Sequence, residues 1–397
     1  MDIISELDGK RILIWGYGRE GKATEHFLER CAKPESVDIF EGKREEINED
    51  AYDFIIKSPG IVMKEENPKY TSETELFLQQ FRDQVIGITG TKGKSTTSAM
   101  LYTVLKACSG RPVLLLGNIG QPCLDYFEEV TEDTIIVYEM SCHQLAHTNV
   151  SPHIAIFLNL YEEHLDYYGT VEKYFEAKSH IAAYQKSGDF FFVGENVPKI
   201  ETKAEKTVLH QPKDVHYKLR LAGEHNQYDA QFVEHVAELL GCEKEVVLKS
   251  MAEFEGLPHR LQYIGTYRGV RYFDDSISTI PEAAINAAMS IPDAKTILIG
   301  GMDRGINYDL LITFIREHRE FQFICAYASG KRIFGEVGDC ENCVYVEDLE
   351  QAVEAAVQMT EPGGACILSP AAASYGYFKN FEERGEAFQK YVYAFAQ

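Results

Sequence analysis

The sequence predicts an α/β protein built from three consecutive α/β domains. Short apolar runs rich in β-branched residues alternate with longer amphipathic stretches, which is the pattern of parallel strands joined by crossover helices. Glycine-rich loops follow two of these runs, and 397 residues suffice for two to three domains. The hydrophobic share of 45% and the charged share of 25% are those of an ordinary globular protein, which argues against disorder and fibrous repeats.

Residues 1–82 predict a Rossmann-like domain. Its first strand, Arg11–Trp15, leads into a glycine loop and a helix whose apolar positions recur at helical spacing. The other elements expected here are strands at 37–40 and 54–56, an irregular break at Ser58, Pro59 and Gly60, and a helix from about Thr71.

Residues 83–256 predict a central domain of the P-loop ATPase type, and residues 257–397 predict a second Rossmann-like domain. The central domain opens with a strand at 85–89, a glycine loop and a helix at 96–107. Its other expected elements are strands at 113–116, 134–139, 154–158 and 190–193 and helices at 223–241 and 244–254. A hinge is expected at 256–258, before strands at 270–273, 296–299, 323–327 and 365–368.

Charge and cysteine content narrow the class of protein. The net charge of −23 argues against a general binder of nucleic acid or anionic membranes, because such proteins need positive surfaces. No apolar run is long enough to span a bilayer, and the acidic, mixed N-terminal stretch lacks a signal-peptide pattern. The nine cysteines are scattered in mostly apolar surroundings, which predicts reduced thiols and a cytoplasmic protein. The single CxxC pair, Cys340 and Cys343, is expected to be a chance or surface feature rather than a zinc site.

The first glycine loop has the pattern of a diphosphate-binding turn. Gly16, Gly18 and Gly21 form GxGxxG between a strand and a helix, where backbone amides can bind a diphosphate. An acidic residue near Asp38 or Glu41 lies about where a ribose-binding carboxylate would be. Taken alone, the pattern fits a nicotinamide dehydrogenase, another diphosphate site, or a tight turn without a ligand.

The second glycine loop, GTKGKSTT at 90–97, is a stronger signal. It follows a strand and begins a helix, so backbone amides and the helix dipole would hold phosphate groups. Lys94 would neutralise the β- and γ-phosphates, and the Ser95 hydroxyl suits Mg²⁺. A dehydrogenase does not explain this loop. Two such loops indicate two bound nucleotides, one of them as part of the substrate.

Polar residues are expected at the same sheet edge as the second loop. Glu139 and His164 each follow an apolar strand and would therefore lie at the carboxyl edge of the sheet. A carboxylate there can hold Mg²⁺, and a neutral imidazole can serve as a further ligand. Lys178 by itself has the pattern of an ordinary lysine on a helix surface.

Together these motifs resemble the Mur ligase family, in its glutamate-adding branch. The resemblance runs in order from the first glycine loop almost to the C-terminus. The segments that carry it are GTKGKSTT (90–97), GNIGQP (117–122), EMSCHQL (139–145), NLYEEHLDYYGTVEKYFEAK (159–178), GEHN (223–226), GLPHR (256–260), GGMDRG (300–305) and LSPAAASYGYFKNFEERGEAF (368–388). The segments FKNFEERG and ELFLQQ (75–80) indicate the branch.

The resemblance implies an ATP- and Mg²⁺-dependent amide ligase of cytoplasmic peptidoglycan precursor synthesis, expected to act as a monomer on small molecules. It would join glutamate to UDP-N-acetylmuramoyl-L-alanine through an acyl phosphate. The catalytic positions it implies are Lys94, Asn118, His164 and Lys178, and the metal-binding positions are Ser95, Glu139, His164 and Lys178, with Lys178 carbamylated. The implied ATP-binding positions are Gly90, Thr91, Lys92, Gly93, Lys94, Ser95, Thr96, Asn226, Arg260 and Asp303. The implied substrate-binding positions are Gly16, Tyr17, Gly18, Arg19, Gly21, Ser58, Pro59, Gly60, Asn118, Arg304, Ser374 and Phe381.

The sequence departs from the family pattern in three places. Asp229 stands where the GxHN helix often has a second asparagine, and Lys92 replaces the commoner asparagine of GTNGKST. In the stretch that begins at Asp274, Ile277 replaces a lysine and Ile280 an asparagine of the familiar form. The acceptor can therefore be D-glutamate, L-glutamate or another amino acid. A nucleotide-binding homologue without catalysis is a further alternative, whereas the first glycine loop argues against a folate-polyglutamylating ligase.

Overall fold

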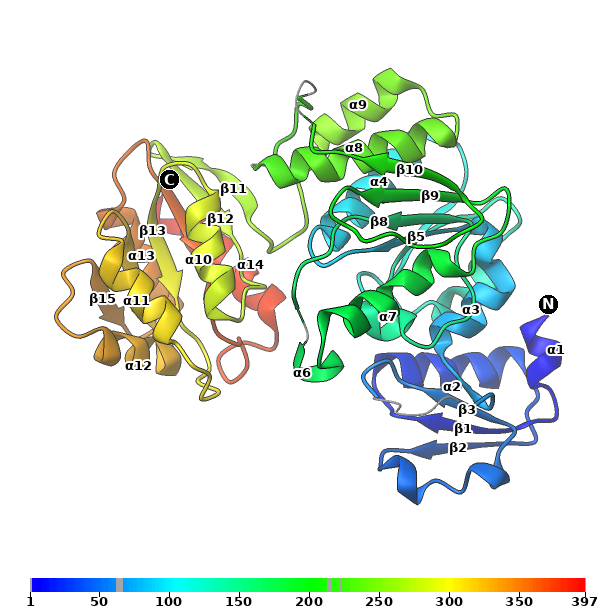
Figure 1. Cartoon of the computed structure of the whole chain (residues 1–397). Coiled ribbons are helices and arrows are strands. Elements are labelled where there is room, and N and C mark those ends of the chain that lie inside the picture. The colour runs from blue at the N-terminus through cyan, green and yellow to red at the C-terminus, as the bar shows by residue number, and fades with distance from the viewer. Residues whose placement is uncertain (1, 62–66, 164, 213–215, 222, 397) are drawn as a thin grey trace. The chain divides into compact units, whose positions relative to one another are not determined.

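The computed structural model describes residues 2–61, 67–163, 165–212, 216–221 and 223–396 (Figure 1). The chain divides into two compact units. Unit 1 contains Met1–Leu219 and Glu224–Phe254, and unit 2 contains Arg220–Gly223 and Glu255–Gln397. Three sheets joined by helices make up the two units, which confirms the predicted α/β class. Whether residues 1–82 act as a domain of their own stays a prediction.

The first sheet of unit 1 is parallel, with strand order β2-β1-β3-β4. Its strands are β1 (Arg11–Trp15), β2 (Ser36–Phe40), β3 (Phe54–Lys57) and β4 (Tyr70–Thr71), and its helices are α1 (Ile3–Leu7), α2 (Arg19–Cys31) and α3 (Glu73–Phe81). The α3 helix begins after Ser72, whose hydroxyl accepts a hydrogen bond from the Glu75 amide. The α2 helix has no side-chain cap at Gly18, which leaves its first amides for another acceptor.

The second sheet of unit 1 is also parallel, with strand order β10-β9-β8-β5-β7-β6. Its strands are β5 (Val85–Thr89), β6 (Val113–Gly117), β7 (Ile135–Glu139), β8 (Ile154–Phe157), β9 (Phe190–Gly194) and β10 (Glu205–Leu209). The helices are α4 (Lys94–Cys108), α5 (Cys142–Leu145), α6 (Leu165–Tyr168), α7 (Val171–Ala183), α8 (Glu224–Leu239) and α9 (Lys244–Glu253).

One hydrophobic core joins the two sheets of unit 1. Phe27 of α2 and Phe77 of α3 belong to the same buried cluster as Tyr138 and Phe157 of the second sheet, and Ile181 of α7 packs there too. The glycine loop of the first sheet is therefore held in a defined position relative to the central sheet.

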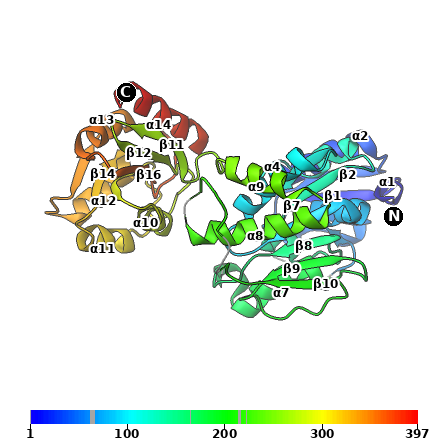
Figure 2. The same cartoon turned by 90° about the horizontal axis from the view of Figure 1, so that it is seen from above.

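Unit 2 contains the third sheet, with strand order β11-β12-β16-β13-β14-β15, in which only the β11–β12 pair is antiparallel. Its strands are β11 (Gln262–Tyr267), β12 (Val270–Asp274), β13 (Ala294–Ile299), β14 (Gln322–Ala326), β15 (Cys343–Val346) and β16 (Ala365–Leu368). Its helices are α10 (Pro281–Ser290), α11 (Asp309–Glu317), α12 (Tyr327–Val337), α13 (Leu349–Met359) and α14 (Phe381–Phe395). Alternate residues of these strands point to opposite faces of the sheet and belong to two hydrophobic cores, one under α10–α12 and one under α13 and α14. Figure 2 shows this sheet with helices on both sides.

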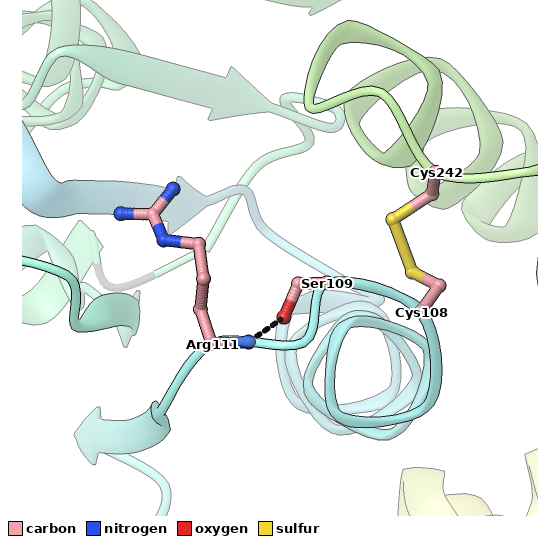
Figure 3. The surroundings of a disulfide bond; sticks show 4 residues. All are labelled: Cys108, Ser109, Arg111 and Cys242. Carbon is pink, nitrogen blue, oxygen red and sulfur yellow. Dashed lines mark hydrogen bonds between the residues drawn. A yellow bond between two sulfur atoms is a disulfide. The ribbon is translucent and has the colours of Figure 1, made fainter.

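The prediction of reduced thiols is wrong for two of the nine cysteines. Cys108, the last residue of α4, forms a disulfide with Cys242, which lies between α8 and α9 (Figure 3). Seven other cysteines are free. Cys340 and Cys343 are both buried, so a surface placement of this pair is wrong, whereas its chance occurrence stays a prediction. Sequence spacing does not reveal the disulfide, because its two cysteines are 134 residues apart.

Two searches of the described residues bear on ligands and membranes. Within the ranges given above, no cluster of three or more His, Cys, Asp or Glu side chains is arranged to hold a metal ion. In the same part of the chain, no helix is both long and apolar enough to cross a membrane.

Candidate active site

The phosphate loop connects β5 to α4 at the carboxyl edge of the second sheet. Gly90 and Gly93 have φ angles of 158° and 83°, in the region that favours glycine. The α4 helix begins directly after Gly93, so its first amides and the positive end of its dipole face the loop. This strand–loop–helix arrangement is the one that the sequence predicts for residues 85–108.

Asn159 fixes the phosphate loop by hydrogen bonds, although the sequence did not identify it as a site residue. Its side-chain oxygen accepts a hydrogen bond from the Lys92 amide at 2.9 Å, and its side-chain nitrogen donates to the Lys92 carbonyl at 3.0 Å. The Thr91 amide donates to the Asn159 carbonyl at 3.0 Å. Asn159 lies two residues after the end of the apolar β8 strand, and that position at the carboxyl edge is the signal that could have identified it.

Lys94 and Lys178 meet at one carbonyl oxygen. Lys94 Nζ donates to the Gly90 carbonyl at 2.9 Å, and Lys178 Nζ donates to the same oxygen at 2.8 Å. Lys178 is 1% exposed, so the interpretation as an ordinary surface lysine is wrong. Burial, together with the charge of Lys94, lowers the pKa of Lys178 to about 7. A substantial fraction of Lys178 is therefore a neutral amine near neutral pH.

Glu139 is the last residue of β7 and is completely buried beside the loop. Asn118 Nδ2 donates a hydrogen bond to Glu139 Oε1 at 2.6 Å, so the structure brings these two predicted residues together. Glu139 Oε2 is also buried but has no hydrogen-bond partner. A buried carboxylate oxygen without a donor is costly, and a bound cation would satisfy it.

Helix α8 brings Asp229 to the phosphate loop, and Asn226 lies one helical turn before it. Both are buried. A Cβ atom at Gly93 would lie 2.6 Å from Asp229 Oδ1, which shows how closely the carboxyl group approaches the loop. Burial raises the pKa of Asp229 well above its usual range, which favours the uncharged form of the carboxyl group.

The other predicted residues near the second sheet lie in the phosphate loop, in the first turn of α4, or outside the described residues. Thr91 is buried and its hydroxyl accepts a hydrogen bond from the Tyr161 amide at 2.9 Å, whereas Ser95 and Thr96 lie in the first turn of α4. Lys92 is exposed and pairs with Glu163 at 2.8 Å. His164 lies outside the described residues.

The first glycine loop and the Ser58–Gly60 break lie together in unit 1. Ser58 Oγ donates to the Gly16 carbonyl at 2.9 Å, and a Cβ atom at Gly21 would lie 2.2 Å from the same oxygen. Arg19 donates to the Gly120 carbonyl at 2.8 Å, which links this loop to the loop after β6. The predicted residues Tyr17, Gly18, Pro59 and Gly60 lie in the same two loops. Asp38 lies within β2 and Glu41 just after it, both exposed.

The remaining predicted residues belong to unit 2. Arg260, Asp303, Arg304, Ser374 and Phe381 lie on segments next to the carboxyl ends of β12, β13 and β16, which are adjacent strands. Arg304 donates to the Thr279 carbonyl at 3.3 Å, and Asp303 pairs with Arg332 at 3.1 Å. Ser374 is buried, and Phe381 is the first residue of α14.

Arg384 connects two of these unit 2 loops, and the sequence did not identify it. Its guanidinium is 1% exposed and donates to the Ser276 carbonyl at 2.7 Å and to the Ala372 carbonyl at 3.0 Å. Burial lowers the pKa of Arg384 to about 10, which still leaves it charged near neutral pH. Its position in the FEERG segment gave no signal of burial, because arginine on a helix is usually exposed.

Comparisons with known proteins agree with this geometry. Residues 88–235 match the Mur ligase middle domain family. The chain is 30% identical to the UDP-N-acetylmuramoylalanine–D-glutamate ligase of Aquifex aeolicus, covering 96% of this chain and 98% of that protein. It is also 30% identical to the enzyme of the same name from Streptococcus mutans, with 98% of each chain covered.

Solved structures show the same fold at lower identity. The chain superposes on a MurF ligase from Thermotoga maritima in complex with ADP with a TM-score of 0.60 at 16% identity, covering 98% of this chain and 96% of that one. The MurC ligase of the same organism gives a TM-score of 0.60 at 17% identity, covering 97% and 99%. The chain therefore belongs to the Mur ligase family, in the branch of the UDP-N-acetylmuramoylalanine–D-glutamate ligases.

Proposed function

We propose that this chain uses ATP to join D-glutamate to UDP-N-acetylmuramoyl-L-alanine by an amide bond. The observation that carries the proposal is the phosphate loop with Lys94 and Lys178 on the Gly90 carbonyl and the buried Glu139 beside them. Relatives with this activity in their names match along almost the whole chain. The phosphorylated intermediate, the site residues and the metal are parts of the same proposal.

In the first step, a carboxylate oxygen of the UDP-linked substrate attacks the γ-phosphorus of ATP and ADP leaves. Such a transfer depends mainly on positioning and charge stabilisation. The first amides of α4 would hold the phosphates, and the Lys94 ammonium would balance their charge. In the second step, the amine of glutamate attacks the acyl carbon, inorganic phosphate leaves, and the amine loses a proton.

Mg²⁺ fits the residues that surround the loop. Glu139 Oε2 is a buried oxygen without a partner, and Ser95 offers a hydroxyl in the first turn of α4. Oxygen ligands of this kind are those that Mg²⁺ prefers, and the ion would neutralise phosphate charge. His164 completes the proposed set.

Lys178 is proposed to carry a carbamate. Its lowered pKa leaves a neutral amine available to react with carbon dioxide, and the product is an anion with two oxygens. That anion would face the metal where the ammonium would repel it. A Lys178→Ala variant should lose activity and regain part of it with a short carboxylic acid, whereas full activity without rescue would contradict the carbamate.

The acceptor end of the site would lie in unit 2. Arg304 would meet a carboxylate of the amino acid, and Ser374 and Phe381 would hold its side chain. The first glycine loop with Ser58, Pro59 and Gly60 would bind the diphosphate of the substrate, because the α2 amides lack a side-chain cap. We further propose that the chain works in the cytoplasm as a monomer, which sedimentation of the purified protein can test.

The decisive experiment measures ADP release from ATP with UDP-N-acetylmuramoyl-L-alanine and one amino acid at a time. Release that requires both D-glutamate and the UDP-linked substrate supports the proposal. Release only with L-glutamate would contradict the assigned acceptor and support the alternative suggested by Ile277. Absence of release with every amino acid would favour a nucleotide-binding homologue without catalysis.

A further inference from the structure

Arg260 is flanked by two residues with unusual backbone conformations. The φ angles of His259 and Leu261 are 60° and 43°, in the left-handed region that residues other than glycine rarely occupy. Such a conformation is strained, so it persists only where surrounding contacts enforce it. Arg260 itself is exposed, whereas His259 is buried and Leu261 packs against the core under α10–α12.

Two consecutive aspartates at the end of β12 make hydrogen bonds that hold His259 and Leu261 in these backbone conformations. Asp274 Oδ2 lies 2.7 Å from His259 Nδ1, and Asp275 Oδ1 accepts a hydrogen bond from the Leu261 amide at 3.1 Å. The His259 carbonyl accepts from the Ile277 amide at 3.1 Å. The residues on both sides of Arg260 are therefore tied to the same short segment.

Helix α14 is shaped to accommodate the His259–Asp274 pair. Phe381, Gly385 and Gln389 lie on one face of the helix, four residues apart. Gln389 Nε2 donates to Asp274 Oδ2 at 3.0 Å, and the Phe381 ring contacts the His259 ring edge to face. A Cβ atom at Gly385 would lie 2.0 Å from His259 Nδ1, so only glycine permits the pair at this position.

The groups around His259 favour its protonated form. The hydrogen bond to Asp274 raises the pKa of His259 against the opposing effect of burial, and the nearby Glu382 and Glu386 add to the rise. Asp274 is completely buried, and its other oxygen accepts a hydrogen bond from the Ser276 amide at 2.9 Å. Breaking one member of such a pair leaves the other charge buried without compensation.

We propose that Asp274 and Asp275 are positioning residues that hold Arg260 ready to meet the phosphates of ATP. Asp274 acts through His259, and Asp275 acts through the Leu261 amide. The inference rests on the proposed function, in which Arg260 binds ATP. Two acidic residues near ATP would otherwise be expected to repel it. Each of them instead binds a neighbour of Arg260 by a hydrogen bond inside the protein: Asp274 binds His259, and Asp275 binds the Leu261 amide.

The test is a double-mutant cycle between Asp274→Asn and Arg260→Ala. Asparagine matches aspartate in size, but it has one acceptor oxygen where Asp274 accepts from His259, Gln389 and Ser276. We expect Asp274→Asn to raise the KM for ATP about tenfold and Arg260→Ala to raise it further. The double variant should resemble Arg260→Ala within about twofold, because the two residues act in one chain of contacts. Asp339→Asn, at an exposed position of unit 2, serves as the matched control and should leave KM unchanged.

The outcomes separate this inference from the proposed function. If Asp274→Asn leaves KM unchanged, or if the two effects multiply in the double variant, Asp274 does not act through Arg260 and the inference is overturned. If the unaltered protein releases no ADP, the proposed function fails, and the same cycle is then read from the Kd of MgATP by calorimetry. A histidine-labelled sample gives a second readout: the His259 ring should titrate at lower pH in Asp274→Asn than in the unaltered protein.

Discussion

At the level of single residues, the phosphate loop depends on one close approach between Gly93 and Asp229. The glycine has a left-handed backbone, and the carboxyl group occupies the space that a side chain would need. Because burial favours the uncharged form of Asp229, the carboxyl group can lie beside the loop with less repulsion of phosphate. This arrangement explains how the chain tolerates an aspartate at a position where the family pattern often has an asparagine.

The Gly93→Ala variant tests this approach. The new methyl group would lie 2.6 Å from Asp229 Oδ1, so the loop or α8 must shift and ATP binding should weaken by more than tenfold. The matched control is Gly110→Ala, which has a similar φ of 64° but no atom within 4 Å of the new carbon. It should lose about 1 kcal/mol of stability from backbone strain and keep its ATP affinity. Equal ATP affinities for the two variants would show that the approach is unimportant.

A second pair of acids, the buried Glu73 and the half-buried Glu20, lies where the first glycine loop meets the central sheet. Glu20 and Glu73 each have one oxygen without a partner, while Gln144 donates to Glu20 at 2.9 Å and the Leu124 amide to Glu73 at 2.9 Å. Burial and the charge of Glu20 raise the pKa of Glu73 well above its usual range. We therefore expect the pair to hold a proton near neutral pH.

The Glu73→Gln variant should be more stable than the unaltered protein at pH 8. A carboxyl group with a raised pKa binds its proton more tightly in the folded state, so its contribution to stability falls as pH rises above the unfolded value. Glutamine keeps the acceptor for the Leu124 amide and adds a donor for Glu20. Urea unfolding should give a gain of about 1–3 kcal/mol at pH 8, shrinking at pH 5. Glu132→Gln, at an exposed position, is the control, and a gain independent of pH would contradict the shared proton.

At the level of elements, the sequence predicts the interior strands, and the strands that it misses lie at sheet edges. The predicted strand at 365–368 agrees with β16, and those at 154–158 and 270–273 differ from β8 and β12 by one residue at one end. The missed strands β4, β10, β11 and β15 all lie at sheet edges, where half-exposed residues do not form an apolar run.

In the candidate site, the sequence predicts the local features and misses those that depend on long-range contacts. The order of strand, glycine loop and helix predicts where the phosphates would bind, because that geometry is local. The burial of Lys178, the His259–Asp274 pair and the Cys108–Cys242 disulfide depend on contacts between residues far apart in the chain. A single sequence carries no direct signal for such contacts, and charged side chains are expected at the surface.

The disulfide ties the far end of α4 to the loop between α8 and α9 (Figure 3). We expect the free energy of unfolding of a Cys108→Ser, Cys242→Ser double variant to be about 2–5 kcal/mol lower than that of the oxidised protein. The reason is that the disulfide closes a long loop and so restricts the unfolded chain. The KM for ATP should change less than twofold, since Lys94 begins the same helix at its opposite end. A thiol reductant should destabilise the unaltered protein and leave the double variant unaffected. Equal stabilities under oxidising conditions would contradict a stabilising role.

At the level of the whole molecule, the net charge of −23 coexists with ligands that are all anionic in the proposed reaction. The proposed contacts are few and local: the amides at the starts of α2 and α4, Lys94, Arg260, Arg304 and the proposed Mg²⁺. These groups are divided between units 1 and 2, since the phosphate loop belongs to the first and the two arginines to the second. ATP can therefore be bound by all of its proposed partners only if the two units come together around it.

Limited proteolysis tests this requirement. Glu255 is exposed, Gly256 has a φ of 91°, and the boundary between the units falls just before them, so a glutamyl endopeptidase should cut there in the free protein. A ligand that binds the joined arrangement stabilises it by mass action, and a non-hydrolysable MgATP analogue should therefore slow this cut several-fold. Cleavage after Glu132, in an exposed turn of unit 1, provides the internal control and should not change. Arg260→Ala should abolish the protection, because the nucleotide would lose its contact with unit 2 while keeping the phosphate loop. Equal protection in that variant would mean that ATP is held by unit 1 alone, and the proposed task of Arg260 would have to be abandoned.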